Sequence, residues 1–204
     1  MNKKYKSKYL PSESVNKLRL VSYDKYPDSI FNGWQLGLER FIEESIKQKP
    51  DFDVKPSESS IRELYAKYNN LIKDSHNKNI VQIFRYERLW LKHNFPAIKK
   101  RLEKDDLNID IYIGLIKNDK ELRTEFRKSS IQNKIKKLQH KVTIIELGIV
   151  PLISGTFGDK YSVIESLPTY DYSDNSGELF YFTFEGVNLL NAATKYVKQY
   201  RNDL

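Results

Sequence analysis

Closely spaced lysines between residues 128 and 141 are the clearest candidates for chemistry in this chain. They surround a row of apolar residues at helical spacing and comprise Lys128, Lys134, Lys136, Lys137 and Lys141. If the apolar row is buried, much of the opposite surface is positive, and flexible ammonium groups there would contact phosphates. The spacing therefore predicts a nucleic-acid-binding surface that supplies affinity more than sequence readout. A solvated lysine-rich face is the alternative interpretation.

A second basic cluster lies at the start of the sequence. Lys3, Lys4 and Lys6 alternate with Tyr5 and precede Tyr9, with no acidic residue among them. Lysines would bind phosphates, and the tyrosine rings could stack on bases. We expect residues 1–14 to form a basic flexible arm, with a solubilising tail as the alternative.

An acidic pair and a lysine nominally match the spacing of one metal-dependent nuclease superfamily. Asp28 follows a proline, and Asp53 lies two residues before Lys55. In such enzymes the carboxylates hold a divalent cation and the lysine assists the attacking water. That chemistry needs neighbouring strands, whereas we expect Asp28 at a helix start and Asp53 in a loop. A nuclease without a clear motif is therefore kept only as an alternative.

Other catalytic and metal-binding patterns are missing from the sequence. Gly155 and Gly158 precede Lys160, but Asp159 intrudes and the spacing is not that of a phosphate-binding loop. The chain has no cysteine, and its histidines lie far apart at His76, His93 and His140. We therefore expect no catalytic residue, no metal site and no cofactor, and we predict that the protein is not an enzyme.

Composition and charge limit the class of protein. The 204 residues fit one domain or two small ones, and the aromatic content of 13% argues against disorder. No apolar run approaches the roughly 18 residues that span a bilayer, and the N-terminus has no signal-peptide pattern. Together with the absence of cysteine, this predicts a cytoplasmic protein without a membrane partner. The net charge of +8 is concentrated in residues 117–141, while residues 151–190 are acidic.

Helical periodicity dominates the first two thirds of the chain. The spacing of Trp34, Leu38 and Phe41 predicts a helix over residues 28–49, and further helices are predicted over residues 57–73, 80–93 and 96–103. Apolar residues stepping by four and three from Ile131 to Ile145 predict a long helix packed in a globular bundle, with a short coiled coil as the alternative. Alternation over residues 108–117 favours a strand.

The last part of the chain predicts a hairpin followed by a helix. Residues 161–167 and 180–183 read as strands, Thr183 could cap a helix over about residues 184–200, and a turn-rich run separates the strands. The fold class is therefore mainly α with a small β-hairpin. We divide the chain into the arm, a helical body over residues 15–117, and a unit over residues 118–204 that holds the long helix, the hairpin and the closing helix.

Residues 180–190 resemble the last strand and closing helix of bacterial winged-helix proteins. The resemblance implies that the C-terminal part is a winged-helix-like unit. Asp171, Asp174 and Glu178 make the hairpin tip acidic, where a phosphate-contacting wing would have basic residues. This departure favours protein contacts, as in the accessory subunits of SMC-type ATPases and of prokaryotic antiphage (antiviral defence) assemblies.

The sequence thus predicts a non-enzymatic accessory subunit of a DNA-associated complex, with a winged-helix transcription regulator as the alternative. Its partners would be nucleic acid and other protein subunits, such as an SMC-type ATPase. Apolar and tyrosine residues that no predicted helix needs would form the protein interface. These are Leu147, Ile149, Leu152, Ile153, Tyr170 and Tyr172.

Overall fold

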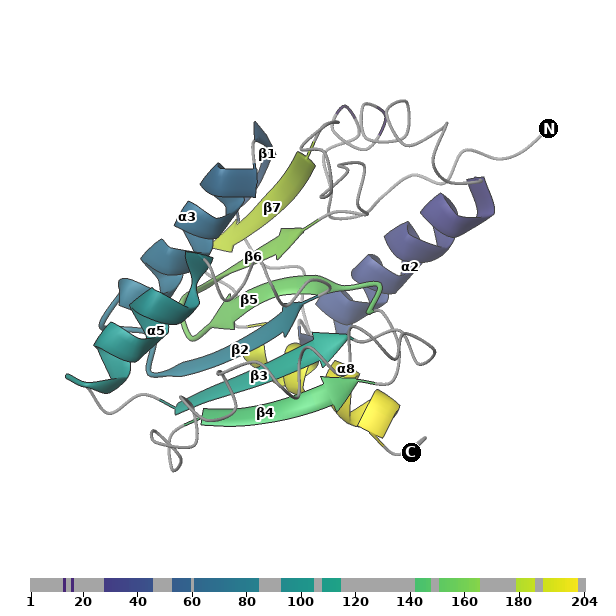
Figure 1. The fold of residues 1–204 in the computed structure, drawn as a ribbon. Helices are drawn as coiled ribbons and strands as arrows, with labels where there is room; N and C mark the ends of the chain where they lie inside the picture. The colour runs from purple at the N-terminus through teal and green to yellow at the C-terminus, as the bar shows by residue number, and fades with distance from the viewer. Residues whose placement is uncertain are drawn as a thin grey trace, which may run out of the picture.

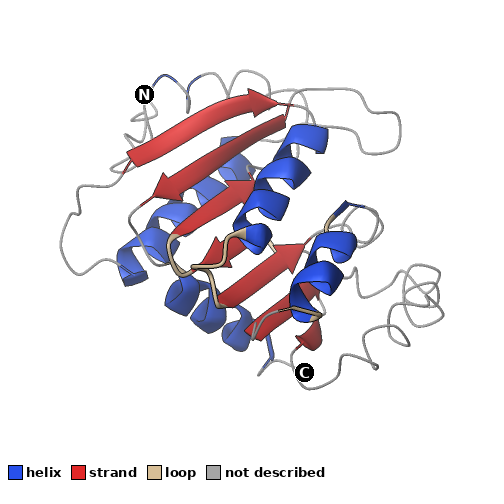
Figure 2. Ribbon diagram, turned by 90° about the vertical axis from the view of Figure 1, so that its left-hand side faces the viewer, coloured by secondary structure: helices blue, strands red, loops and turns tan. Residues whose placement is uncertain are grey.

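A seven-stranded mixed sheet between two layers of helices forms the protein (Figure 1). The architecture comes from a computed structural model. It describes residues 28–45, 53–59, 61–84, 93–104, 108–114, 142–147, 151–165, 179–185 and 189–201, together with Glu13 and Asn16. Figure 2 shows helices on both sides of the strands. The fold class is therefore α/β.

Four helices and seven strands make up the described chain; helices and strands alternate as far as β3, and β4 to β7 then precede the last helix. The helices are α2 (Asp28–Ser45), α3 (Ile61–Lys73), α5 (Phe95–Leu102) and α8 (Leu190–Arg201). The strands are β1 (Asp53–Ser59), β2 (Asn79–Phe84), β3 (Asn108–Gly114), β4 (Val142–Leu147), β5 (Ser154–Gly158), β6 (Tyr161–Glu165) and β7 (Leu179–Glu185).

The strand order is β1-β7-β6-β5-β2-β3-β4, and it divides the sheet in two. β2, β3 and β4 are parallel to one another, whereas β5, β6, β7 and β1 form an antiparallel series. β2 joins the two parts because it also pairs with β5 in the antiparallel sense. The chain thus places β3 and β4 on one side of β2 and then returns to build β5 on the other.

Each face of the sheet has its own apolar core. α2 and α8 cover one face, where Trp34 and Phe41 lie against Phe182 and Phe157, with ring centroids 6.3 and 5.3 Å apart. α3 and α5 cover the other face, where their buried residues meet β2, β3 and β6. Because β2 is buried on both faces, apolar residues occupy neighbouring positions along it, as in Ile80-Val81 and Ile83-Phe84.

The prediction of a mainly α protein is wrong, and two segments explain why. Residues 80–84 form part of β2, not a helix, because their apolar side chains alternate between the two cores. Residues 142–147, predicted as the end of a long helix, form β4. A run buried on both faces has no period of two, so short apolar segments of this kind are easily taken for helix.

The hairpin prediction is confirmed, but its surroundings differ from a winged-helix unit. β6 and β7 pair antiparallel, with Val163 opposite Thr183. Thr183 is not a helix cap, since β7 continues to Glu185 and α8 begins at Leu190. β7 also pairs with β1, in the segment that was expected to be a loop around Asp53. The hairpin is therefore an internal part of the large sheet.

Several other sequence predictions are confirmed. Helices occur at α2, α3 and α5, and a strand occurs at β3. The α3 residues predicted to share one face are buried, namely Leu64, Tyr65, Tyr68, Leu71 and Ile72. The domain boundary predicted between residues 117 and 118 falls between β3 and β4, and these two strands are hydrogen-bonded neighbours in the same sheet.

A buried arginine fastens the connection from α3 to β2. Arg101 of α5 is 7% exposed, and its Nη1 donates to the carbonyl oxygens of Ile72 and Asp74, the latter at 2.6 Å. Its Nη2 donates to the carbonyl oxygen of Asn77 at 3.0 Å. The guanidinium thus gives the Ile72 and Asn77 carbonyl oxygens a partner, adds a second donor to the Asp74 carbonyl oxygen, which also accepts the Asn77 N–H, and ties α5 to the end of α3.

We expect Arg101→Met to lower the free energy of unfolding by about 3 kcal/mol, because it removes three charge-assisted hydrogen bonds and leaves carbonyls unsatisfied. Lys100→Met is the matched control, since Lys100 is exposed on the same helix and should change stability by less than about 0.5 kcal/mol. Urea unfolding followed by circular dichroism measures both. Equal losses in the two variants would contradict this role of Arg101.

Gly155 allows β5 and β6 to approach each other closely. A Cβ atom at this position would lie 2.3 Å from the carbonyl oxygen of Val163, a backbone atom that cannot move aside alone. We expect Gly155→Ala to destabilise the fold by about 2 kcal/mol or more. Gly33→Ala, in an open position on α2, should instead stabilise it by about 0.5 to 1 kcal/mol. Thermal unfolding of the two variants in parallel tests whether Gly155→Ala lowers the stability while Gly33→Ala raises it.

Candidate functional site

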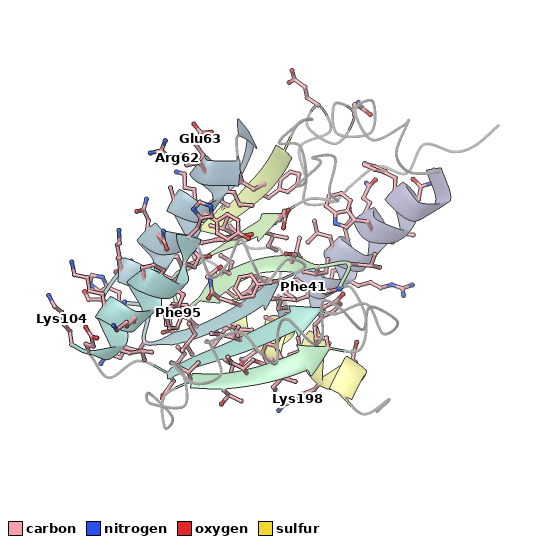
Figure 3. The ribbon with its side chains drawn as sticks, viewed as in Figure 1. Phe41, Arg62, Glu63, Phe95, Lys104 and Lys198 are labelled. Carbon is pink, nitrogen blue, oxygen red and sulfur yellow. The ribbon has the colours of Figure 1, made fainter. Side chains whose placement is uncertain are left out.

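Basic side chains gather on the outer surface of α3 and α5, on the loops at their C-terminal ends and on the β5–β6 turn. We call this set the α3–α5 basic surface; its exposed members are Arg62, Lys67, Lys73, Lys78, Lys99, Lys100, Lys104 and Lys160. The acidic residues in the same region are Glu63, Asp74, Glu103 and Asp159. Figure 3 shows Arg62 and Lys104 near opposite ends of this layer, with nitrogen-tipped side chains directed outward between them. The balance of charge is positive and accessible to a polyanion.

Asp159, one of these acidic residues, accepts hydrogen bonds from backbone N–H groups. Asp159 Oδ2 accepts the N–H groups of Lys78 and Asn79 at 2.8 and 2.9 Å. Buried Asn77 accepts the N–H of Lys160 at 3.0 Å and donates to the carbonyl oxygen of Leu71 at 3.2 Å. The loop between α3 and β2 is thus bound to the β5–β6 turn. The backbone positions of Lys78 and Lys160 are fixed beside each other as a result.

Asp74 and His76 form a local pair in the same loop. Asp74 Oδ1 accepts the backbone N–H of His76 at 3.0 Å and lies 2.8 Å from its ring Nδ1. The hydrogen bond from the His76 backbone lowers the pKa of Asp74; burial opposes this, while the His76 ring and Lys160 lower the pKa further. The carboxylate therefore stays ionised to lower pH than usual.

Because the folded-state pKa of Asp74 lies below its unfolded value, the stability that it contributes is present above about pH 4 and is lost as pH falls through the lowered pKa. We expect Asp74→Asn to cost about 1 kcal/mol at pH 7, and the difference from the unmodified protein to shrink in acid. Glu103→Gln, an exposed residue 3.8 Å from Lys99, should show little pH-dependent difference. Chemical unfolding at a series of pH values tests this.

A row of polar side chains crosses the sheet where β2 meets β5. Gln82 Nε2 donates to Thr156 Oγ1 at 2.9 Å, and Ser154 Oγ lies 3.1 Å from both the Ile83 carbonyl oxygen and Glu165 Oε2. Open α/β sheets bind ligands at the carboxyl ends of strands where the strand order reverses, which is the position of Ser154. The four side chains are less than a tenth exposed and pair with one another, so they join strands in the interior.

Tyr65 of α3 is buried and interacts electrostatically with Glu165, at one end of this polar row. Burial raises the pKa of its phenol well above the usual value, and the nearby Glu165 raises it further. The phenol is therefore neutral in the physiological range. Tyr161 behaves similarly near the other end of β6, where burial first, and then Asp74 and Glu185, raise its pKa to about 12.

Of the site residues predicted from the sequence, Leu147, Leu152 and Ile153 are among the described residues. Leu147 and Ile153 are buried in the core beneath α2 and α8, which accounts for their apolar character, whereas Leu152 is 44% exposed. The other predicted contacts lie outside the described residues; they are Ile149, Tyr170 and Tyr172 for the partner, and Lys3, Lys4, Lys6, Lys128, Lys134, Lys136, Lys137 and Lys141 for nucleic acid.

The α3–α5 basic surface was missed by sequence reasoning. Its basic residues are spread over residues 62–104 and 160, so no single window is strongly charged. The signal was nevertheless present on α5, where Lys99 and Lys100 lie opposite the buried Ala97 and Ile98 in helical phase. Only the packing of α5 beside α3 brings the dispersed charges together.

Metal and membrane sites are not found in the parts of the chain that the structure describes. No group of three or more His, Asp or Glu residues there could hold a metal ion. Among the same residues, no helix combines the length and the apolar character required to cross a bilayer.

No family model and no curated protein matches the chain. Among solved structures, similarity is found to the archaeal chromatin protein TrmBL2, with a TM-score of 0.47 and 12% identity over 99% of this chain and 75% of that one. NucT from Helicobacter pylori gives 0.46 and 15% over 72% and 95% of the two chains. Nuc from Salmonella typhimurium, a phospholipase D family member, gives 0.46 and 11% over 74% and 93%.

These comparisons contradict the prediction that the protein is not an enzyme, because a phospholipase D family member is among the similar structures. We withdraw that prediction. At identities of 11 to 15% and TM-scores below 0.5, the similarities assign neither a substrate nor an activity to this chain.

Proposed function

We propose that the protein binds nucleic acid and that the α3–α5 basic surface contacts its phosphates. The observation that supports this most directly is the set of exposed lysines on α5 and just after its end, namely Lys99, Lys100 and Lys104. Lysine ammonium groups act as flexible point charges, and each phosphate that they neutralise releases counterions. Binding of this kind is strong at low salt and depends little on sequence.

The rigidity of the supporting loops favours this function over a merely solvated face. Lys78 and Lys160 are held at fixed backbone positions by Asp159 and Asn77. Two acidic groups that would repel phosphates, Asp74 and Asp159, already accept backbone N–H groups. Their charge is thereby partly compensated, so the basic character of the region is stronger than a plain count of charges indicates.

A finer form of the proposal is that the protein works as a subunit of a DNA-associated complex, for instance beside an SMC-type ATPase. Leu152 supports this form, because it is 44% exposed and its backbone is held firmly. The N–H groups of Leu152 and Ile153 donate to Tyr196 Oη at 3.1 and 3.2 Å. An exposed leucine on a fixed backbone is suited to contact another protein subunit.

Replacement of Lys99, Lys100 and Lys104 by Gln should weaken nucleic-acid binding across unrelated sequences. If all three contact phosphates, the slope of the logarithm of the binding constant against the logarithm of salt concentration should fall by about 2 to 3. Fluorescence anisotropy titrations at several salt concentrations measure both quantities.

The control is the pair Lys195→Gln and Lys198→Gln on α8, which lies against the opposite face of the sheet (Figure 3). This pair removes exposed positive charge from the other layer and should leave the salt dependence nearly unchanged. If the α5 and α8 variants lose affinity equally, the binding is a response to net charge, and the assignment to the α3–α5 basic surface fails.

A further inference from the structure

An aspartate and a histidine form a dyad in the loop between α3 and β2. Asp74 Oδ1 lies 2.8 Å from the ring Nδ1 of His76 and also accepts the backbone N–H of His76 at 3.0 Å. The Asp74 side chain is 28% exposed, and that of His76 is 65% exposed. The two side chains are therefore held together within their own loop, while the imidazole ring remains accessible to a ligand.

The charge of Asp74 determines which nitrogen of the neutral imidazole carries the proton. The hydrogen bond from the His76 backbone lowers the pKa of Asp74, burial opposes this, and the His76 ring and Lys160 lower the pKa further. An ionised carboxylate only accepts hydrogen bonds, so Nδ1 of the ring must be the donor. The other ring nitrogen, Nε2, then carries the lone pair whenever the ring is neutral. A carboxylate that orients an imidazole in this way prepares Nε2 to act as a general base.

Two lysines of the α3–α5 basic surface lie beside this dyad. Lys160 is close enough to lower the pKa of Asp74, and Lys78 follows His76 by two residues. Hydrogen bonds join the loop that carries Lys78 to the turn that carries Lys160, and both side chains are exposed. Ammonium groups at this position would attract a phosphate to the imidazole and compensate the negative charge that develops on its oxygens during reaction.

We propose that this dyad is a catalytic site that cleaves RNA by transesterification, with His76 as the general base and Asp74 as its positioning residue. The inference rests on the proposed function, which brings a phosphate backbone to the surface that carries these lysines. A ribose 2′-hydroxyl supplies the nucleophile from within the substrate, next to the phosphorus that it attacks. DNA lacks this hydroxyl, so it should bind to the same surface without being cleaved.

The proposed reaction moves one proton through the imidazole. His76 Nε2 takes the proton of the 2′-hydroxyl while the 2′ oxygen bonds to the adjacent phosphorus, and the bond from phosphorus to the 5′ oxygen of the next nucleotide breaks. The departing 5′ oxygen takes a proton from water, and the imidazolium returns its proton to the hydroxide that is left. The products are a 2′,3′-cyclic phosphate and a 5′-hydroxyl end.

The test uses a single-stranded RNA oligonucleotide that carries a fluorophore and a quencher, with DNA of the same sequence as the uncleavable probe. We expect the unmodified protein to cleave only the RNA and to leave a 2′,3′-cyclic phosphate, which mass spectrometry identifies. His76→Gln, which cannot take up the proton, should lower kcat about 100-fold or more and leave the affinity for the DNA probe nearly unchanged. Ser75→Ala, at an exposed position of the same loop, is the control and should cleave like the unmodified protein.

Asp74→Asn tests the positioning role separately. It should lower kcat at least about tenfold with KM nearly unchanged, because the amide no longer fixes the proton on Nδ1 of the ring. The assay is run at a temperature at which circular dichroism shows the variant to be folded, so that the loss of rate is distinct from a loss of stability. An unchanged kcat would contradict the role assigned to Asp74.

Three results would overturn the inference as a whole. They are intact RNA after incubation with the unmodified protein, equal cleavage of RNA and DNA, and a His76→Gln variant that cleaves as fast as the unmodified protein. The last result would assign the activity to another site or to a contaminating nuclease. The proposed function fails separately, if the DNA probe is not bound at low salt or if the α5 lysine variant binds it as tightly as the unmodified protein.

Discussion

The position of β2 is the constraint on which the rest of the structure depends. It is parallel to β3, antiparallel to β5 and buried on both faces, so it belongs to both halves of the sheet and to both cores. Its register is strongly specified, because a shift by one residue would move Gln82 from Thr156 into the apolar core beneath α2 and α8. A buried amide without its hydrogen-bond partner lowers the stability of the fold. The Gln82–Thr156 pair therefore favours one alignment of the parallel and antiparallel halves of the sheet.

The same strand connects the interior to the charged surface. The loop that enters β2 is held by Arg101 from α5 and by Asp159 from the β5–β6 turn. These contacts close a buried helix end, and they also determine where Lys78 and Lys160 emerge. The backbone at the base of the basic surface is therefore attached to the sheet and to α5 by hydrogen bonds.

The elements that sequence alone predicted well keep a clear period. α3 has one buried face and an unbroken helical period from Leu64 to Ile72. β7 contacts both cores, yet its phenylalanines alternate with Tyr181 and Thr183, which preserves a period of two. β2 and β4 were misassigned because their apolar residues serve two cores, which erases the period of two. β1 was missed for a different reason: its sequence Asp-Val-Lys-Pro-Ser-Glu-Ser has little strand propensity, and its pairing with β7 forms the edge of the sheet.

The candidate site, too, depends on contacts between residues that are far apart in the sequence. Clustered lysines are visible in a sequence window, whereas the α3–α5 basic surface combines residues that are close only after α5 has packed on α3. The same packing places Asn94 against Asn69 and brings His93 onto Tyr65. Seven of the eight exposed cations on this surface are lysines. Lysine ammonium groups act as point charges without the planar fork of arginine, so the proposed contact with a phosphate backbone would depend little on base sequence.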